Sequence, residues 1–135
     1  MIELSKEKPY EDACKILGLR PVANYKSYKL TDETRNFIKL ETVAKALNEG
    51  WKPTTIDPKE VRYYVWGWNY TDNRKPSGLL NVCSLDGLGS AGAAVGTSLE
   101  FKDGDTAKEF ARMCKPMIVK YLFGRDDHEN FKFNF

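Results

Sequence analysis

Histidine is nearly absent from the chain, whose 135 residues include only His128. Any Ser-His-Asp or Cys-His arrangement that uses a histidine must therefore use this one. His128 stands beside Asp126, Asp127 and Glu129 near the end of the sequence, where we expect a surface tail. A tail of this kind neither holds an imidazole against a nucleophile nor supplies a second fixed metal ligand. We therefore predict no histidine-dependent catalysis and no metal site.

Cysteine is also scarce, and its spacing excludes two further classes of protein. Cys14, Cys83 and Cys114 are odd in number, far apart, and without a C-x-x-C pair. Such spacing gives no support to a disulfide framework or to a zinc site. We expect all three to be buried as small apolar residues.

The chain has little net charge and no long apolar run. Its 21 Lys and Arg against 19 Asp and Glu leave a formal charge of +2. This excess supports strong, sequence-independent phosphate binding only if the cations cluster in space. No run approaches the roughly 20 apolar residues of a membrane span, and residues 1–8 lack an apolar stretch of signal-peptide length. We expect no membrane association and a reducing cytoplasm.

Composition and length indicate one folded domain over residues 1–135. A hydrophobic fraction of 41% with 30% charged residues is that of an ordinary globular protein. Residues 125–135 are expected to be either a flexible tail or a short extra strand, because Phe131, Phe133 and Phe135 alternate with polar residues.

Two helices are predicted in the first 50 residues. Pro9 suits the first position of a helix that ends at Gly18. Thr31 is the expected N-cap of a second helix, which Gly50 closes. The apolar stripe of the second helix consists of Phe37, Leu40, Ala44 and Leu47.

A third helix is predicted before residue 124. Asp103 or Asp105 is its N-cap, Pro116 bends it, and Gly124 ends it. Its apolar stripe is the strongest in the chain and consists of Ala107, Phe110, Ala111, Cys114, Met117, Ile118, Tyr121 and Leu122.

Three segments read as strands between the second and third helices. They are the aromatic run Tyr63–Tyr70, the stretch Leu79–Leu85, and Val95–Lys102, in which apolar and polar residues alternate. We therefore predict an α+β fold: two N-terminal helices, an antiparallel sheet of three or more strands, and a C-terminal helix packed on that sheet.

Two further patterns have ordinary structural explanations. The segment Gly87–Gly92 matches G-x-G-x-x-G, but it leads within a few residues to a predicted strand instead of a long helix, so a hairpin loop is favoured over a phosphate site. Carboxylate pairs stand at the predicted helix starts, where capping and dipole compensation account for them: Glu11 with Asp12, Asp32 with Glu33, and Asp103 with Asp105.

The aromatic run is the leading candidate for a recognition surface. Strand alternation places Tyr64, Trp66, Trp68 and Tyr70 on one face, with the basic residues Arg62, Arg74 and Lys75 flanking them. Such rings can form a stacking platform for the bases of a single-stranded nucleic acid, while the cations meet phosphates. The alternative is that the rings pack beneath the helices, because aromatic residues are also strong strand formers.

Three stretches of the chain carry a family resemblance: Tyr10–Gly18, Ala44–Pro53, and Val95–Lys102 running into the last helix. On these stretches the chain resembles a group of small proteins encoded by bacteriophages and prophages of gut Bacteroidetes. The resemblance implies a phage origin and a place in the cytoplasm of a bacterial host. The group has no established activity, so it implies no site residues.

We therefore expect a binding module without enzymatic activity or a cofactor, which contacts single-stranded nucleic acid through the aromatic strand. The alternative is a protein-interaction module that binds a host or phage protein through a strand edge or through Phe131, Phe133 and Phe135.

Overall fold

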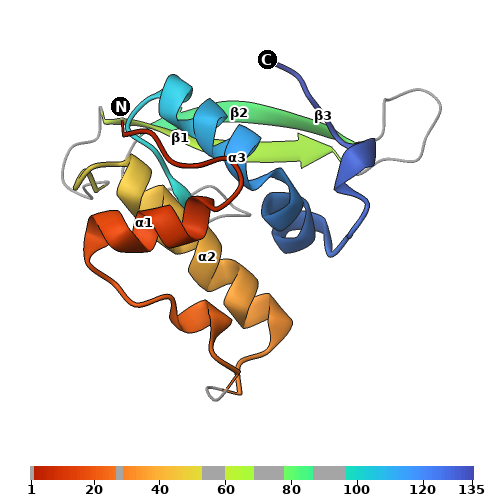
Figure 1. Cartoon of the computed structure of the whole chain (residues 1–135). Coiled ribbons are helices and arrows are strands. Elements are labelled where there is room, and N and C mark those ends of the chain that lie inside the picture. The colour runs from red at the N-terminus through yellow and green to blue at the C-terminus, as the bar shows by residue number, and fades with distance from the viewer. Residues whose placement is uncertain (1, 27–28, 53–59, 69–77, 87–96) are drawn as a thin grey trace.

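The computed structural model describes residues 2–26, 29–52, 60–68, 78–86 and 97–135 (Figure 1). Within these ranges it has an α+β fold, as predicted. In chain order the elements are α1 (Pro9–Leu17), η1 (Val22–Asn24), α2 (Asp32–Leu47), β1 (Val61–Trp68), β2 (Leu79–Asp86), η3 (Thr97–Leu99), α3 (Gly104–Phe123), η4 (His128–Asn130) and β3 (Lys132–Phe133).

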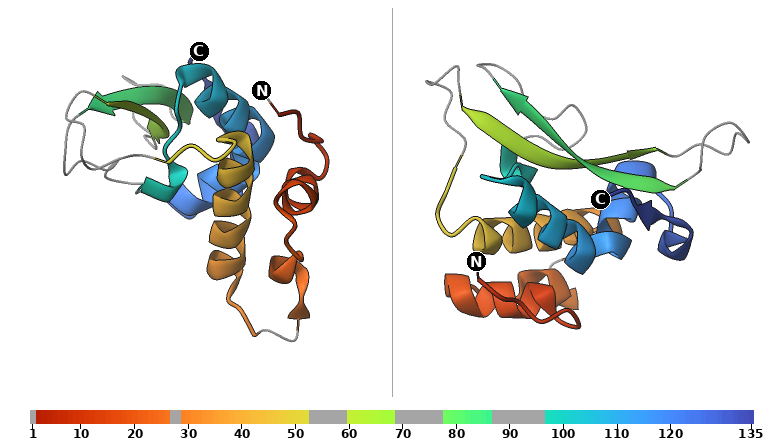
Figure 2. Two further views of the ribbon diagram at one scale, coloured as in Figure 1. Left: turned by 90° about the vertical axis from the view of Figure 1, so that its left-hand side faces the viewer. Right: turned by 90° about the horizontal axis from the view of Figure 1, so that it is seen from above.

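The elements form layers. Figure 2 shows the three α-helices on one side of the sheet, with α2 and α3 next to it and α1 farthest away. The strand order is β1-β2-β3, in which β1 and β2 are antiparallel while β2 and β3 are parallel. The sheet is therefore mixed, whereas the sequence predicted an antiparallel one.

The helix boundaries follow the local signals in the sequence. Pro9 is the first residue of α1, and Gly18 ends that helix in a left-handed conformation with φ 68°. The Thr31 side chain accepts a hydrogen bond from the Thr34 N–H, which confirms it as the N-cap of α2. This helix ends at Leu47, earlier than the closing residue Gly50 predicts.

The third helix confirms the predicted bend and settles the choice of cap. Asp103 is the N-cap of α3, and its carboxylate accepts a 2.7 Å hydrogen bond from the Thr106 N–H. Pro116 cannot donate a hydrogen bond to the preceding turn, and the backbone at Cys114 is non-helical, with φ −112° and ψ 19°. Gly124 ends the helix with φ 64°.

Replacing Asp103 with alanine is expected to lower the free energy of unfolding by about 1 kcal/mol at pH 7. Burial favours a higher pKa for the Asp103 carboxyl, but the hydrogen bonds from Thr106 outweigh it and lower the pKa below 3.8. The cap therefore stabilises the fold above pH 3.8 and loses its effect as the pH falls through the lowered value. Urea unfolding at several pH values measures this. Asp105→Ala is the matched control in the same turn, and equal losses in both variants would contradict the assignment.

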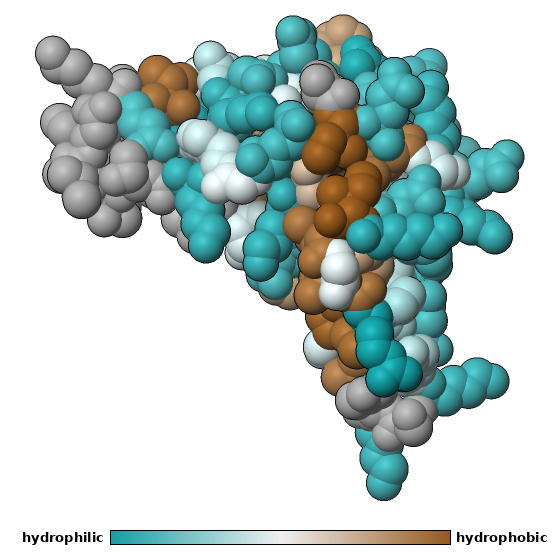
Figure 3. Space-filling model, turned by 60° about the vertical axis from the view of Figure 1, so that its left-hand side comes forward, coloured by the Kyte–Doolittle hydropathy of each residue, from teal (hydrophilic) through white to brown (hydrophobic). Residues whose placement is uncertain are grey.

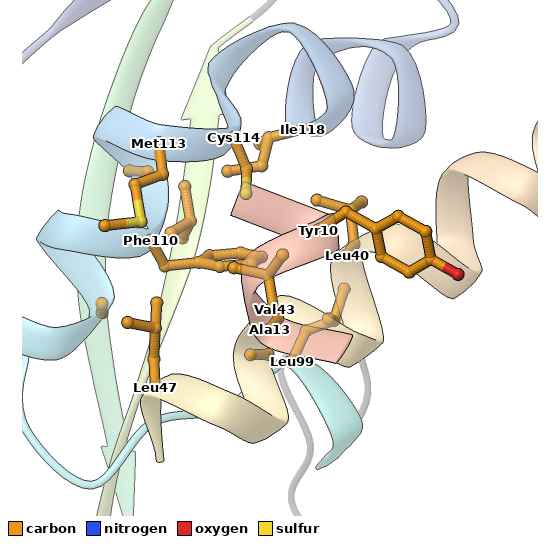
Figure 4. Close-up of a cluster of buried hydrophobic side chains, with 14 of the residues drawn as sticks. Tyr10, Ala13, Leu40, Val43, Leu47, Leu99, Phe110, Met113, Cys114 and Ile118 are labelled. Carbon is orange, nitrogen blue, oxygen red and sulfur yellow. The ribbon is translucent and has the colours of Figure 1, made fainter. Parts of the chain in front are cut away.

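The hydrophobic core lies between the sheet and the helices (Figure 4). Leu40, Val43 and Leu47 of α2 meet Phe110 and its neighbours on α3, and all are buried. Phe110 also packs on Phe101, with ring centroids 4.7 Å apart. Tyr10 and Ala13 of α1 add to this cluster, so one core joins the three helices to the sheet.

The predicted strand Val95–Lys102 is wrong in the part that the structure describes. Residues 97–99 form the short helix η3, and only Phe101 pairs with β1, through an isolated bridge to Tyr63. Both backbone hydrogen bonds of that bridge form, at 3.0 and 2.7 Å. The chain reaches the α3 cap at Asp103 two residues later, so no longer strand develops.

The third strand comes from the C-terminal segment instead. Asn134 donates its backbone N–H to the Leu80 carbonyl at 2.8 Å, next to the two-residue strand β3. The ring of Phe131 is fully buried and stacks on Phe123, with centroids 5.2 Å apart. Of the two possibilities for residues 125–135, the structure therefore shows the short extra strand.

Apolar side chains also reach the surface. Figure 3 shows them gathered in a band on one face, with hydrophilic side chains on both sides. Ile16 and Leu19, at and after the end of α1, are about half exposed. Across the described ranges, no helix is long and apolar enough to cross a membrane.

Candidate functional site

The two faces of β1 have different surroundings. Val65 is 2% exposed and lines a small void with residues of α2 and α3, so the odd-numbered face is the core side. Gly67 belongs to the same face, where an added Cβ would lie 3.1 Å from the Phe123 ring. The even-numbered residues of β1 therefore point to the outer face of the sheet, where Tyr64 and Trp66 are partly exposed but Arg62 is buried.

The outer face carries two of the predicted aromatic residues. Tyr64 and Trp66 are both partly buried, and their cross-strand partners on β2 are Cys83 and Asn81. Directly opposite residues of an antiparallel pair share a face, so these four side chains form one surface. In Figure 2 no helix of the described part lies on this side of the sheet.

This surface continues onto the C-terminal strand. The Asn134 side-chain amide donates a 2.8 Å hydrogen bond to Asn81 Oδ1, which places both asparagines on the outer face. Lys132 is two residues earlier, so it shares that face, and it is exposed. We name Tyr64, Trp66, Asn81, Lys132 and Asn134 the outer-face set.

Asn81, Lys132 and Asn134 were not among the predicted site residues. The alternation of Phe131, Phe133 and Phe135 was a usable signal, because inward phenylalanines require Lys132 and Asn134 to point outward. No residue near this segment indicated which strand it would pair with.

The prediction that Arg62 offers a surface charge is wrong. Its side chain is 3% exposed, and its Nε lies 3.3 Å from Oε2 of Glu100, which is fully buried. The Tyr63–Phe101 bridge brings the two together. Arg62 precedes Tyr63 and Glu100 precedes Phe101, so both side chains point to the face opposite that of the bridge partners. Burial raises the pKa of the Glu100 carboxyl, the Arg62 charge opposes this, and nearby Glu60 adds to it.

The Tyr64 hydroxyl and the Cys83 thiol on the outer face favour their neutral forms. Burial, followed by the nearby Cys83 and Glu100, raises the pKa of the Tyr64 hydroxyl. Burial likewise raises the pKa of the Cys83 thiol, so the thiolate needed for nucleophilic attack is disfavoured. The face is therefore better suited to stacking and hydrogen bonding than to covalent chemistry.

The remaining predicted contacts are described only in part. Trp68 ends β1, and its side chain lies outside the described part of the structure. Tyr70, Arg74 and Lys75 also lie outside the described residues, as does the loop Gly87–Gly92.

The three C-terminal phenylalanines have different environments. Phe131 is a core residue, so the prediction that it contacts a partner is wrong. Phe133 is partly buried, with Lys115 Nζ 5.4 Å from its ring centroid. Phe135 is 38% exposed, and the Arg112 guanidinium lies 5.2 Å from its ring centroid. The segment is held against α3 by these cation–π contacts.

The described residues bring no three His, Cys, Asp or Glu side chains close enough to hold a metal ion. His128 belongs to η4, with Nε2 3.9 Å from a Glu129 carboxylate oxygen. Its neighbour Asp127 is instead paired with Arg125, and that hydrogen bond holds the Asp127 pKa well below its usual range.

Comparison with known proteins gives no relative from which a function could be transferred. No protein-family model matches the chain, and no curated protein or solved structure does. The resemblance to phage-encoded proteins therefore stays a prediction.

Proposed function

We propose that this protein is a non-enzymatic module that binds single-stranded nucleic acid across the outer face of its sheet. One observation carries the proposal: the partly exposed rings of Tyr64 and Trp66 adjoin the Asn81–Asn134 pair on a sheet face without a covering helix in the described part. Bases would stack on the rings, the amides would meet base edges, and Lys132 would contact a phosphate. On the resemblance to phage-encoded proteins, we propose that this activity takes place in the cytoplasm of a bacterial host cell.

The charge distribution sets the expected character of this binding. Arg62 is paired with Glu100, so among the described residues Lys132 is the exposed cation on this face. Few phosphate contacts make the affinity depend only weakly on salt. For single strands each contact adds about −0.7 to the slope of the logarithm of the binding constant against the logarithm of the salt concentration. Stacking is worth about 1 to 3 kcal/mol per base and supplies most of the affinity.

Replacing Trp66 with alanine is expected to weaken oligonucleotide binding by roughly 5- to 150-fold, the equivalent of one lost stacking contact. Lys132→Gln should weaken binding less and make the salt slope shallower by about 0.7. Fluorescence anisotropy of a labelled single-stranded oligonucleotide measures both effects.

Lys15→Gln is the matched control, because Lys15 is an exposed cation on α1, the helix layer farthest from the sheet. Circular dichroism establishes that each variant is folded. Absence of binding at low salt, or full binding by a folded Trp66→Ala protein, would overturn the proposal.

The alternative of a protein-interaction module has less structural support. Phe131 fills the core, and Phe133 is partly covered, so Phe135 is the one C-terminal phenylalanine with an exposed ring. Removing the segment after Gly124 would also delete β3, so a loss of partner binding on truncation would not separate contact from folding. Phe135→Ala is the variant that tests this alternative in a pull-down experiment.

A further inference from the structure

A polar hollow lies where η1, α2 and α3 meet. It is shallow and open to solvent, with a volume of about 420 Å³. Its described lining includes no residue of the sheet and consists of Ala23, Asn24, Lys26, Asp32, Arg35, Asn36, Lys39, Met117 and Lys120.

The hollow collects positive charge that is spread along the sequence. Lys26, Arg35, Lys39 and Lys120 line it, against the single carboxylate of Asp32. Arg35 and Lys39 share a face of α2 because they are four residues apart. Clustering of this kind is the condition under which a chain with a small net charge can still bind an anion strongly.

The described ion pair of Lys120 is a weak one. Lys120 Nζ lies 3.9 Å from Asp126 Oδ1, but the Asp126 side chain is 92% exposed. Ion pairs so exposed contribute little, because water and salt screen them. Lys120 therefore keeps most of its capacity to attract an anionic ligand.

The Arg35 guanidinium is positioned but incompletely satisfied. Its Nη2 donates a long, 3.5 Å hydrogen bond to the Tyr25 carbonyl. Its Nε is buried and has no hydrogen-bond partner among the residues that the structure describes. An anion in the hollow would therefore meet the terminal Nη groups of this guanidinium, of which Nη2 makes only that long bond.

The framework around these cations is tied together by side chains from distant segments. The Asn36 side-chain amide donates a 2.9 Å hydrogen bond to the Met117 carbonyl, which joins α2 to α3. Lys39 Nζ lies 5.9 Å from the ring centroid of Tyr10, whose hydroxyl accepts a hydrogen bond from the Ala23 N–H. Two of the cations, Arg35 and Lys39, thus contact neighbouring segments, which reduces the entropy lost on binding.

We propose that this hollow binds a chain of two or more linked phosphate groups. Four cations fit several adjacent charges better than one: two lie on α2, one on α3 and one in the segment after η1. The described lining has no aromatic ring on which a base could stack, so recognition is of the phosphates. Inorganic polyphosphate and the triphosphate of a nucleotide share this chemistry. The site is separate from the outer-face set and does not depend on it.

Isothermal titration of the full chain with tripolyphosphate at low salt tests this proposal. We expect binding at one site, and about tenfold weaker binding after either Arg35→Gln or Lys39→Gln, since each removes a charge-assisted contact. Lys45→Gln is the matched control on α2, because Lys45 is exposed and outside the hollow. Trp66→Ala should bind tripolyphosphate normally, which separates this test from that of the sheet surface.

Two comparisons identify the source of the phosphates. Similar affinities for ATP and tripolyphosphate support recognition of the phosphate chain itself. ATP binding more than tenfold tighter would overturn it, because a base contact would then dominate. Absence of tripolyphosphate binding, or equal weakening by Lys45→Gln, would also overturn the proposal. If Arg35→Gln fails to fold, Lys39→Gln and Lys120→Gln provide the same test.

Discussion

Replacing Arg62 with methionine is expected to lower the free energy of unfolding by about 3 to 5 kcal/mol at pH 7, the usual cost of removing one partner from a buried ion pair. The variant leaves Glu100 fully buried without its cation. Neither carboxylate oxygen of Glu100 accepts a hydrogen bond from the described residues, so little else compensates the charge. Urea unfolding followed by circular dichroism measures the loss.

The pH dependence of the loss identifies its cause. Burial raises the pKa of Glu100 above 4.5, and Arg62 is the neighbour that opposes this rise, so the variant has a still higher pKa. The neutral Glu100 carboxyl contributes its full stability below the pKa that it has in the unfolded chain, about 4.5. This contribution is lost as the pH rises through the higher pKa of the folded protein. The difference between Arg62→Met and the unaltered protein should therefore shrink as the pH is lowered toward 4.5.

Arg62→Met combined with Glu100→Leu is the control for the missing charge. Replacing both members of a buried pair by apolar side chains is often close to neutral, so the double variant should regain most of the stability. A double variant as unstable as Arg62→Met would show that lost packing of the arginine side chain, and not the unpaired carboxylate, causes the effect.

Sequence reasoning succeeded where the deciding interactions are local. Thr31 and Asp103 accept hydrogen bonds from N–H groups three residues later, and Gly18 and Gly124 supply the positive φ that ends their helices. These signals lie within one helical turn. The same holds for the bend near Pro116, whose cause is the missing N–H of one residue.

Sequence reasoning failed where the deciding partner is distant. The alternation in Val95–Lys102 favoured a strand, but a single bridge to Tyr63 sets the position of Phe101 and turns Glu100 toward Arg62. The burial of that ion pair therefore could not be read from residues near Arg62. The parallel pairing of β3 with β2 is likewise a long-range contact between Leu80 and Phe133.

In both candidate sites, the long-range contacts were not predictable from the sequence. The rings of Tyr64 and Trp66 were predicted from strand alternation, whereas Asn81 and Asn134 meet only after β2 and β3 have paired. The polar hollow had no signal in the sequence, because its cations come separately from α2, α3 and the segment after η1. Their proximity results from the packing of α2 against α3.

Replacing Gly78 with alanine is expected to destabilise the protein far more than the same change at Gly18. Both glycines have left-handed backbone, with φ 76° and 68°, so each alanine costs about 1 to 2 kcal/mol in strain. A Cβ at Gly78 would also lie 2.5 Å from the Asn130 carbonyl oxygen, whereas one at Gly18 meets nothing within 4 Å. The difference between the two variants therefore isolates the contact between Gly78 and the C-terminal segment.

That contact holds β3 in place, so its loss has a second effect. The Gly78 carbonyl accepts a hydrogen bond from the Lys132 N–H, next to the fully buried Phe131. If the C-terminal segment is pushed away from Gly78, the Phe131 ring leaves the core. This lowers the free energy of unfolding by roughly 2 to 3 kcal/mol in addition to the backbone strain. Urea unfolding gives the total, and limited proteolysis with mass spectrometry should show faster cleavage after Gly124 in Gly78→Ala alone. Equal unfolding midpoints for the two alanine variants would mean that the C-terminal segment can move away from Gly78 without loss of stability. Lys132 would then have no fixed position on the outer face.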